Sequence, residues 1–501
     1  MIKSIFKSII LLQIMAIILS GQNRGNNLGF QGVAKVSDFS VRALGMGSAF
    51  ISMNGSIDAL AFNPAGLATV KDIQVSLGMS SISRQWTENQ VYNANRYFFT
   101  LPFYLERLYI PDPVNNGRLD HEVFYEALSD SGYVVALPET GQEPFSDSAA
   151  DWKKQLQGSG ISNLSLALPV TVLDKNVVLG LSYNNCGDFF DFDKNETYLD
   201  PHPGYLEYHM PTLVENEADS TIVNWYDFTR QREGSRAEFQ GAVAIDLTPV
   251  IKLGLSVSWF SGETDDRQSF NKVGYFNLID QNQFKWSYDT LDIYTKGTST
   301  FRGIHSEIGM QLIYDAFSFG LDLRLPMTIK REWDYNVIQT DSTGVLKNQQ
   351  KGTDELSIPF SYALGVNFHP ISNFIFSMDY DLRKYSEAEW KFADDDTTRR
   401  TWVDQNIIRF GIEFSPAKML DFRLGYRSVP QIFIPDGAAE KDKGPENNSY
   451  TLGIGLNFGK FGTLNGAWEY GLLKYSDNYF SNTNYAKEVT TKISLGYIYK
   501  F

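Results

Sequence analysis

The most restrictive feature of this chain is a series of segments, starting near residue 160, in which apolar side chains alternate with small or polar ones. YTLGIGLNF (450–458) carries its tyrosine, leucines, isoleucine and phenylalanine at every second position, with threonine, glycine and asparagine between them. IRFGIEF (408–414) and FSFGLDLRL (317–325) repeat the pattern. A period of two residues predicts β-strands whose two faces meet different surroundings.

The length of these segments separates two classes of β-protein. Strands of soluble sandwiches average about five or six residues, whereas these run for about nine to thirteen, which is the length that crosses a bilayer at a tilt. Aromatic residues make up 14% of the chain, yet no stretch after residue 20 has the roughly 20 apolar residues of a spanning helix. We therefore expect an all-β fold, a 14-stranded antiparallel transmembrane β-barrel, rather than a soluble β-protein.

The connections between these segments alternate between tight and long, as they do in outer-membrane barrels with short periplasmic turns. The expected tight turns are 173–176, 248–250, 314–316, 369–372, 415–419 and 459–462. The expected long loops are 185–236, 261–299, 327–356, 386–404, 429–448 and 474–487.

Fourteen strands follow from this division, and an even number leaves both termini on the periplasmic side. The expected strands are 72–81, 161–168, 176–184, 237–247, 251–260, 300–313, 316–326, 357–368, 373–383, 405–414, 420–428, 449–458, 462–473 and 488–501. NRYFFTLPFYL (95–105) is assigned to the first extracellular excursion, although it could form an additional strand. The barrel domain is therefore expected over 72–501.

Both ends of the chain carry targeting signals. Residues 1–21 combine Lys3 and Lys7 with a short apolar run and small residues, the layout of a secretory signal peptide. There is no cysteine near the expected cleavage point, which argues against a lipoprotein. The final strand ends at Phe501, and a closing strand with a terminal phenylalanine is typical of substrates of the outer-membrane barrel assembly machinery. The expected location is the bacterial cell outer membrane, in contact with its lipid.

The face opposite the apolar residues is expected to line the lumen, where its charges mostly pair with one another or with a plug. The expected lumen charges are Asp246, Lys252, Glu307, Asp322, Arg324, Asp379, Asp381, Arg409, Glu413, Asp421, Arg423, Glu469 and Lys492. The net charge of −15 argues against a nucleic-acid partner. Cys186 is the single cysteine, so no disulfide framework exists.

Residues 22–71 do not look like the strands that follow. They are rich in small residues, as in ALGMGSAF (43–50) and DALAFNPAGLA (58–68), which permit tight packing against other backbone. Since a barrel of this size has room for a plug or a narrow pore, we expect this region to be buried in or beneath the barrel. Pro64 fixes its own backbone and lacks an N–H, so Asn63-Pro64 can hold a turn that a modest shift would rearrange.

These two stretches followed by a strand resemble the N-terminal signature of the FadL/OmpP1/TodX family of outer-membrane transporters for long-chain fatty acids and other hydrophobic compounds. The resemblance implies an N-terminal hatch with an Asn-Pro-Ala motif, so that Asn63, Pro64, Ala65 and Gly66 would gate the barrel. It also implies a kink in the third strand that opens a lateral exit, for which Gly180 and Gly187 are the candidates. Candidates for the walls of a hydrophobic pocket are Phe50, Leu60, Phe62 and Leu67, which could equally seat the plug.

The function expected from this resemblance is passive diffusion of fatty acid-like or aromatic compounds through a plugged monomeric barrel. The alternative is the FadL-like PorV branch, whose members serve protein secretion or surface attachment and would have a secreted-protein partner. No nucleophile elbow, zinc-protease helix or phosphate-binding loop is present, so we expect neither an enzyme nor a cofactor. The acidic run DFFDFDKNETYLD (188–200) lacks EF-hand spacing and is interpreted as a solvated loop rather than a calcium site.

Overall fold

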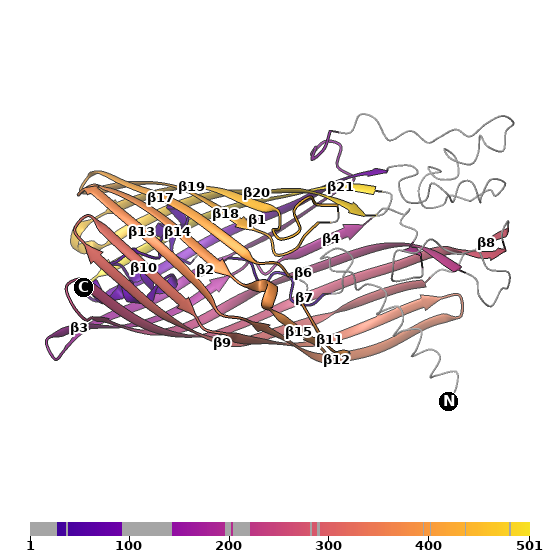
Figure 1. The fold of residues 1–501 in the computed structure, drawn as a ribbon, viewed down its shortest axis with the longest axis horizontal. Coiled ribbons are helices and arrows are strands. Elements are labelled where there is room, and N and C mark those ends of the chain that lie inside the picture. The colour runs from indigo at the N-terminus through magenta and orange to yellow at the C-terminus, as the bar shows by residue number, and fades with distance from the viewer. Residues whose placement is uncertain are drawn as a thin grey trace.

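The computed structural model shows a long antiparallel barrel with a short-turn end and a long-loop end (Figure 1). The described residues are 28–36, 39–92, 143–195, 202–203, 221–280, 283–287, 291–393, 395–400, 402–435, 437–479 and 482–501. The signal peptide and the 95–105 segment lie outside them. No helix in the described ranges has the length and apolar character needed to cross a membrane.

Fourteen strands close the barrel, because each pairs antiparallel with the next and the first pairs with the last. In order around the wall they are β1 (Gln74–Tyr92), β2 (Trp152–Val172), β3 (Lys175–Cys186), β6 (Thr221–Asp246), β7 (Ile251–Asp280), β9 (Leu291–Tyr314), β10 (Phe317–Arg324), β13 (Ser361–Ile371), β14 (Phe374–Arg383), β17 (Gln405–Ala417), β18 (Leu420–Pro430), β19 (Glu446–Asn457), β20 (Thr463–Tyr479) and β21 (Asn482–Lys500). The predicted fold and strand number are confirmed.

The remaining elements extend the barrel at its long-loop end, form its turns or lie inside it. Within the described ranges, seven strands lie outside the ring of fourteen: β4 (Asp191–Asn195), β5 (His202–Pro203), β8 (Gln283–Ser287), β11 (Met327–Asp341), β12 (Gly344–Ile358), β15 (Glu389–Phe392) and β16 (Asp395–Arg399). The helical turns are α2 (Val41–Gly45), η1 (Ile57–Ala61), η2 (Pro64–Thr69), η5 (Tyr385–Glu387) and η6 (Gly459–Phe461).

The two faces of the wall follow the alternation of the sequence. On β19, Leu452 and Ile454 are 50% and 43% exposed on the outside, whereas Thr451, which directly precedes Leu452, is 2% exposed and points inward. The outer faces of the other strands are apolar in the same way, and a water-soluble protein does not present so continuous an apolar surface. Because each strand of the ring pairs with both of its neighbours, apart from one edge of β2 over residues 152–162, the paired backbone can sit in hydrocarbon without unsatisfied groups. The wall is therefore a membrane-spanning one.

Three expected loops are largely strand, which corrects the sequence-based boundaries. The expected loop 261–299 contains the ends of β7 and β9, which pair as far as Lys272 with Leu291. The expected loop 327–356 forms the β11–β12 hairpin, which extends the sheet beside β9. The expected loop 474–487 contains the paired ends of β20 and β21. On the β7 extension the outward side chains of Glu263 and Asp265 are exposed and charged, whereas Thr264 and Asp266 between them are polar and buried inside. The apolar alternation therefore ends although the backbone pairing continues.

The end of the chain lies beside its first strand. The Phe501 backbone N–H donates to the carbonyl of Ile73, with N and O 2.9 Å apart, so the last residue extends the β1–β21 ladder at the short-turn end. The Phe501 side chain is exposed. A carboxyl-terminal aromatic residue at the barrel rim agrees with the expected assembly signal, whose recognition stays a prediction.

Candidate functional site

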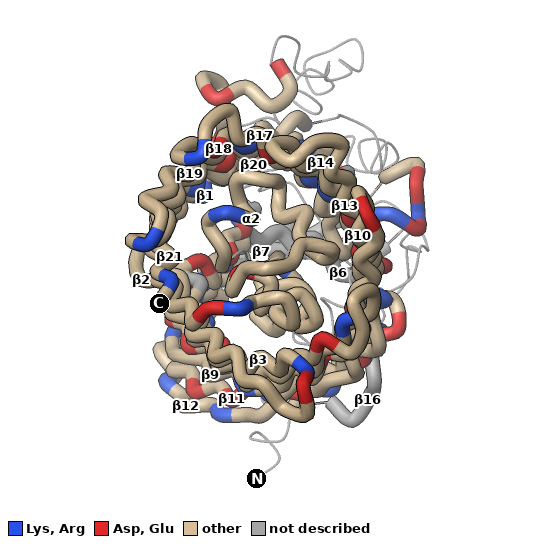
Figure 2. The backbone as a smooth tube through the Cα atoms, turned by 90° about the vertical axis from the view of Figure 1, so that its left-hand side faces the viewer, with Lys and Arg blue, Asp and Glu red and all other residues tan. Residues whose placement is uncertain are grey.

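The lumen is occupied by the chain's own N-terminal region. Residues 39–72, here called the hatch segment, form α2, η1 and η2 and lie inside the ring of strands when the barrel is viewed from its short-turn end (Figure 2). The α2 turn packs against the β18–β21 side of the wall, and η2 packs against β3, β6, β7 and β9. The hatch segment therefore spans the lumen between opposite sides of the wall.

The Asn63-Pro64 turn is tied to both the hatch segment and the wall. Asn63 is fully buried; its Nδ2 donates to the carbonyl of Ile51 at 2.9 Å and to the wall carbonyls of Met310 and Leu321 at 3.2 and 3.3 Å. Its Oδ1 accepts the N–H of Ala65 at 3.0 Å, which caps η2 with proline in the first position. One amide side chain thus fixes the hatch turn against two neighbouring strands.

Inward-facing glycines of the barrel allow the hatch backbone to lie directly on the wall. A Cβ at Gly254 would come within 2.5 Å of the Pro64 carbonyl carbon, and one at Gly411 within 2.5 Å of the Met46 carbonyl oxygen. Real Cβ atoms do not approach so closely, so only glycine fits at these positions. We call this set the glycine wall: Gly254, Gly309, Gly320, Gly365, Gly411, Gly425 and Gly453.

Buried charges of the wall also hold the hatch segment. Asp379 accepts the backbone N–H groups of Phe50 and Ile51 at 2.6 and 3.0 Å. Arg42 of the hatch segment forms a two-pronged ion pair with Glu413 at 2.7 and 2.9 Å, and Arg423 donates to the same carboxylate at 2.6 Å. The expectation that lumen charges pair with one another or with the plug is confirmed for these residues.

The four candidate pocket residues separate into two groups. The ring centroids of Phe50 and Phe62 lie 5.4 Å apart in a small core that includes Ala363 of the wall. Leu60 and Leu67 pack together over Gly180, where a Cβ would come within 2.9 Å of both side chains. None of the four lines the larger cavity described below. Their contacts seat the hatch segment, and a role in ligand binding stays a prediction.

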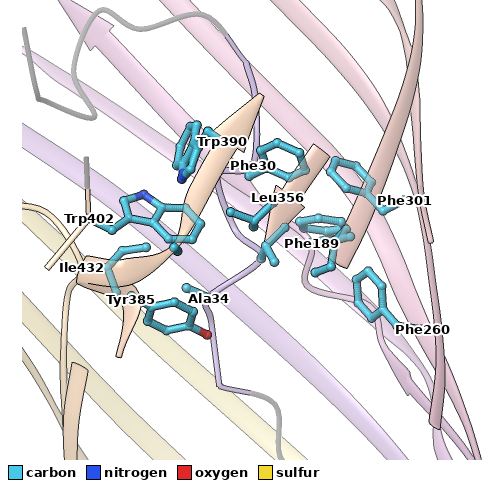
Figure 3. Packing of buried hydrophobic residues seen from close by; sticks show 13 residues of the cluster. Phe30, Ala34, Phe189, Phe260, Phe301, Leu356, Tyr385, Trp390, Trp402 and Ile432 are labelled. Carbon is cyan, nitrogen blue, oxygen red and sulfur yellow. The ribbon is translucent and has the colours of Figure 1, made fainter. Parts of the chain in front are cut away.

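A second inner segment, residues 28–36, lies nearer the long-loop end and is called the N-terminal strap. Two arginines of β6 clamp its backbone: Arg232 donates to the carbonyls of Gly29 and Gln31 at 2.9 and 3.1 Å, and Arg236 donates to those of Val33 and Lys35 at 3.1 and 2.6 Å. Figure 3 shows Phe30 of the strap packed among aromatic residues of the wall and of the loop elements.

The wall is interrupted beside the third strand. β3 pairs with β2 only as far as Asn184 with Asn163, after which residues 187–190 turn inward and β4 resumes the pairing with β6. Phe189 and Phe190 are buried inside. Over 152–162, β2 pairs with β1 but has no partner on its other edge among the described residues. This unpaired edge is called the seam.

The two glycines expected at a third-strand kink differ in position. Gly187 lies where β3 leaves the wall, and its carbonyl oxygen occupies the space that a Cβ of Gly158 on β2 would need. Gly180 lies within the regular ladder, paired with Ala167 and Ala242. β3 therefore leaves the wall at Gly187, whereas Gly180 accommodates the hatch leucines, and the part of either glycine in a lateral exit stays a prediction.

A cavity of about 170 Å³ lies between the N-terminal strap and the wall from β17 to β1, and it reaches the seam. Its basic lining residues are Lys35, Arg84, Arg230, Arg427, Lys487 and Lys492. Its acidic lining residues are Glu88, Asp188, Asp191, Asp193, Glu469 and Glu488. Its aromatic lining residues are Phe30, Trp86, Trp152, Phe192, Trp390, Trp402, Phe433 and Tyr475. Opposite charges and aromatic rings thus meet in one space.

Lys35 brings a titratable group into this cavity. Its Nζ donates to the carbonyl of Phe190 at 2.7 Å and lies 5.7 Å from the centre of the Trp86 ring. Burial removes the ammonium from water and Arg84 repels it, so the pKa of Lys35 falls to about 8 although Glu488 partly offsets the shift.

The Lys35 pKa predicts a pH-dependent stability. Between about pH 8 and the ordinary lysine pKa near 10.5, the unfolded chain binds more protons than the folded one, so the free energy of unfolding rises with pH through this window. We expect the wild type to gain stability relative to Lys35→Met as the pH is raised from 7 to 10. Urea unfolding in micelles at both pH values measures the difference. A constant difference would contradict the buried ammonium.

Several functional residues were not found from the sequence. Arg232, Arg236 and Phe189 fall in a region interpreted as a loop, and Lys35 lies in a stretch without a strand pattern. The glycines of the wall occur at alternate strand positions, so the sequence pattern places them on the inner face. Their contacts with the hatch segment could not be predicted, because these join residues hundreds of positions apart. In the described part of the chain, no three His, Cys, Asp or Glu side chains form a metal-binding group. Residues 196–200 of the acidic run 188–200 lie outside the described residues.

The comparisons with known proteins agree with this architecture. No family model matches the sequence, and no curated protein does either. Among solved structures, a Pseudomonas aeruginosa FadL homologue is similar with a TM-score of 0.57 and 14% identity, over 93% of this chain and 99% of that one. The P. putida toluene transporter TodX has a TM-score of 0.52 and 13% identity, over 92% and 97%. The CymD monoaromatic hydrocarbon channel has a TM-score of 0.52 and 12% identity, over 92% and 96%.

These likenesses concern the fold. The chain has the fold of the FadL-like channels over nearly its whole length, so the resemblance drawn from the N-terminal signature is confirmed at that level. A closed antiparallel barrel with an apolar outer face and one end of short turns is an architecture of the bacterial outer membrane. The expected location is therefore confirmed.

Proposed function

We propose that this chain is a monomeric outer-membrane channel through which small hydrophobic compounds diffuse without an energy source. A compound would enter at the long-loop end, occupy the cavity beside the N-terminal strap and leave through the seam into the membrane. The hatch segment would close the short-turn end and so keep the lumen from acting as a water pore. The observation that carries the proposal is the cavity that reaches the seam above a hatch segment seated on the wall.

The physical reason for a side exit is the free-energy cost of exposing an apolar compound to water. An apolar compound gains about 25 cal/mol for each Å² of its surface that leaves water, so a route that ends in the hydrocarbon is favoured over one that ends in the aqueous periplasm. The inner side of the seam is suited to such a compound. Ile82, Trp86, Leu156 and Phe190 form a buried apolar cluster there, and Phe192 packs against Trp152 at 5.2 Å between ring centroids.

Locking the seam should therefore stop transport. A Cβ built on Gly187 lies 3.8 Å from the backbone nitrogen of Ser159, so Ser159→Cys with Gly187→Cys, in a Cys186→Ser background, should form a disulfide across the seam. We expect oxidised cells to lose most uptake of a labelled hydrophobic compound and to regain it after reduction.

The matched control places the disulfide within the regular ladder. Leu179 and Val243 are paired outward-facing residues of β3 and β6, so Leu179→Cys with Val243→Cys should leave uptake unchanged. If the seam disulfide forms but uptake continues at the wild-type rate, the exit does not lie there.

The transport function itself is tested by deletion. Cells without the protein should take up labelled fatty acids or aromatic hydrocarbons more slowly, and the wild-type gene should restore the rate. Unchanged uptake across such a panel, together with a secreted protein that co-purifies stoichiometrically from the envelope, would favour the secretion-related alternative instead.

A further inference from the structure

We propose that the outer face of the barrel binds the phosphate group of an outer-leaflet lipid, at a row of basic side chains on β9, β11 and β15. This inference concerns the outside of the wall, goes beyond the proposed transport function and does not depend on it. Its basis is the register of neighbouring strands, the charge that this register leaves without a counter-charge, and the apolar surface on the membrane side of the row.

The strand register places the basic side chains at one level. Arg302 of β9 lies opposite Lys330 of β11. Lys330 lies opposite Glu355 of β12, which in turn lies opposite Lys391 of β15. Arg302, Lys330 and Lys391 are exposed, and both sequence neighbours of Arg302 are buried, so its side chain points outward. These strands lie together on one flank of the barrel (Figure 1). We call Arg302, Lys330 and Lys391 the basic row.

The basic row carries more positive charge than its surroundings neutralise. Side chains directly opposite each other on paired strands have Cβ atoms about 4.5–5.5 Å apart, and like charges there destabilise the pair. Glu355 contacts Lys330 at 3.1 Å, but neither Arg302 nor Lys391 forms an ion pair with another described residue. An anion that reached Arg302 and Lys330 together would remove their mutual repulsion.

The surface on the membrane side of the basic row is apolar. Two residues nearer the short-turn end, about 7 Å along the strands, Trp259 and Ile304 lie opposite each other and are 47% and 62% exposed. Phe239 stacks on Trp259 with 5.8 Å between ring centroids. Farther along, the outward pair of Leu255 and Ile308 is also exposed. Aromatic rings that border an apolar band are typical of a membrane interface, so the basic row lies at the level of lipid headgroups.

Acidic side chains lie on the other side of the basic row. Glu263 and Glu332 are exposed and lie opposite Thr300, two residues nearer the long-loop end than Arg302. An anion that approached from water would pass these carboxylates first and be repelled by them. An anion carried by a lipid approaches from the membrane side, where no such charge intervenes. The order of charges therefore favours a lipid phosphate over a free one.

The chemistry of the row matches a phosphate with acyl chains attached. A guanidinium group offers a planar fork of N–H donors that binds two phosphate oxygens at once, and an ammonium group adds a point charge. The stems of both side chains can lie along apolar surface while their charged ends reach the headgroup level. Acyl chains of the same lipid would cover Trp259 and Ile304. Because short turns face the periplasm in such barrels, the lipid within reach belongs to the outer leaflet.

Native mass spectrometry of the purified full-length protein in detergent tests this inference, with diphosphorylated lipid A as the probe. We expect Arg302→Gln and Lys330→Gln each to weaken lipid A binding about five-fold, the effect of one exposed charged contact, and the double variant to weaken it more than ten-fold. Glu355→Gln removes the acid that competes for Lys330 and should strengthen binding. The matched control is Lys351→Gln, whose ammonium already pairs with Asp334 at 2.7 Å; it should leave binding unchanged.

Two further probes identify the source of the phosphate. Lipid A stripped of its phosphates should bind equally to the wild type and the double variant, and inorganic phosphate should not displace intact lipid A. Displacement by inorganic phosphate would overturn the lipid as the ligand. Equal retention of intact lipid A by the wild type and the double variant would overturn the site, and so would an equal loss in Lys351→Gln, which would show a general effect of positive charge.

The inference and the transport proposal fail separately. The double variant changes only the outside of the wall, so its uptake of hydrophobic compounds should equal that of the wild type, and heat-modifiability should show that it folds. If uptake proves independent of the protein while lipid A binding still requires the basic row, transport fails and the lipid site stands.

Discussion

A methyl group at Gly425 is expected to open the barrel to polar solutes. The Cβ of Gly425→Ala would overlap the backbone at Met46 and Gly47, which lies against the wall and cannot move aside as a flexible side chain could. Overpacking of a well-packed site costs about 1–3 kcal/mol. Since that cost falls on the seated hatch segment alone, the fraction of barrels with a displaced hatch should rise about five- to 150-fold.

Single-channel conductance in planar bilayers and the sensitivity of cells to large polar antibiotics measure this effect. The matched control is Gly466→Ala on β20, where the nearest atom to a new Cβ is the Ile454 Cγ2 at 3.4 Å on the outer face. Heat-modifiability of both variants shows that the barrel still folds. A Gly425→Ala channel that folds and stays as tight as the wild type would refute the seating of the hatch on the glycine wall.

The second large effect is expected at Arg232, which is completely buried in a polar network near the long-loop end. It makes two hydrogen bonds of 2.8 Å to Asp266, which also accepts from Ser299 at 2.6 Å and from Tyr335 at 2.7 Å. Arg232→Met would leave Asp266 without its main counter-charge and release the strap carbonyls. Removal of one partner of a buried ion pair costs about 3–5 kcal/mol, which urea unfolding should register.

A double variant separates the effect of Arg232 on stability from its effect on the N-terminal strap. Replacing both members of a buried ion pair by apolar residues is often nearly neutral, so Arg232→Met with Asp266→Leu should recover much of the lost free energy of unfolding. The strap would still lack its clamp, and therefore uptake should stay altered in the double variant. If uptake recovers together with stability, the clamp has no part in transport.

The sequence predicted the wall well because a bilayer imposes strict alternation on whatever crosses it. Each of the fourteen expected segments overlaps a strand of the ring, and Leu452, Ile454 and Thr451 face the sides that the pattern assigned to them. Strand ends were predicted poorly because β7 continues to Asp280, whereas its apolar alternation stops at about Phe260 and polar residues follow on both faces. The hatch could be inferred from its many small residues, since a run of small residues permits close packing against other backbone.

The candidate site was harder to predict because its contacts join distant parts of the chain. Asn63 was identified from the signature, but its bonds to the Met310 and Leu321 carbonyls involve backbone atoms that no residue pattern identifies. Lys35 and Trp390 line the same cavity although they lie in the first and the last third of the chain. Only the closed barrel brings such residues together.

The β1–β21 pairing has a consequence for biogenesis. The hatch segment directly precedes β1, and β1 joins the ring through β21, the last of the fourteen ring strands in sequence order. The cylinder can therefore close only after all fourteen strands are present. The hatch segment contacts strands on opposite sides of the lumen. It therefore has to lie between them when the β1–β21 pairing forms. Its docking is a step of barrel assembly itself, and a chain that closed first would have to thread its own N-terminus back into a finished cylinder.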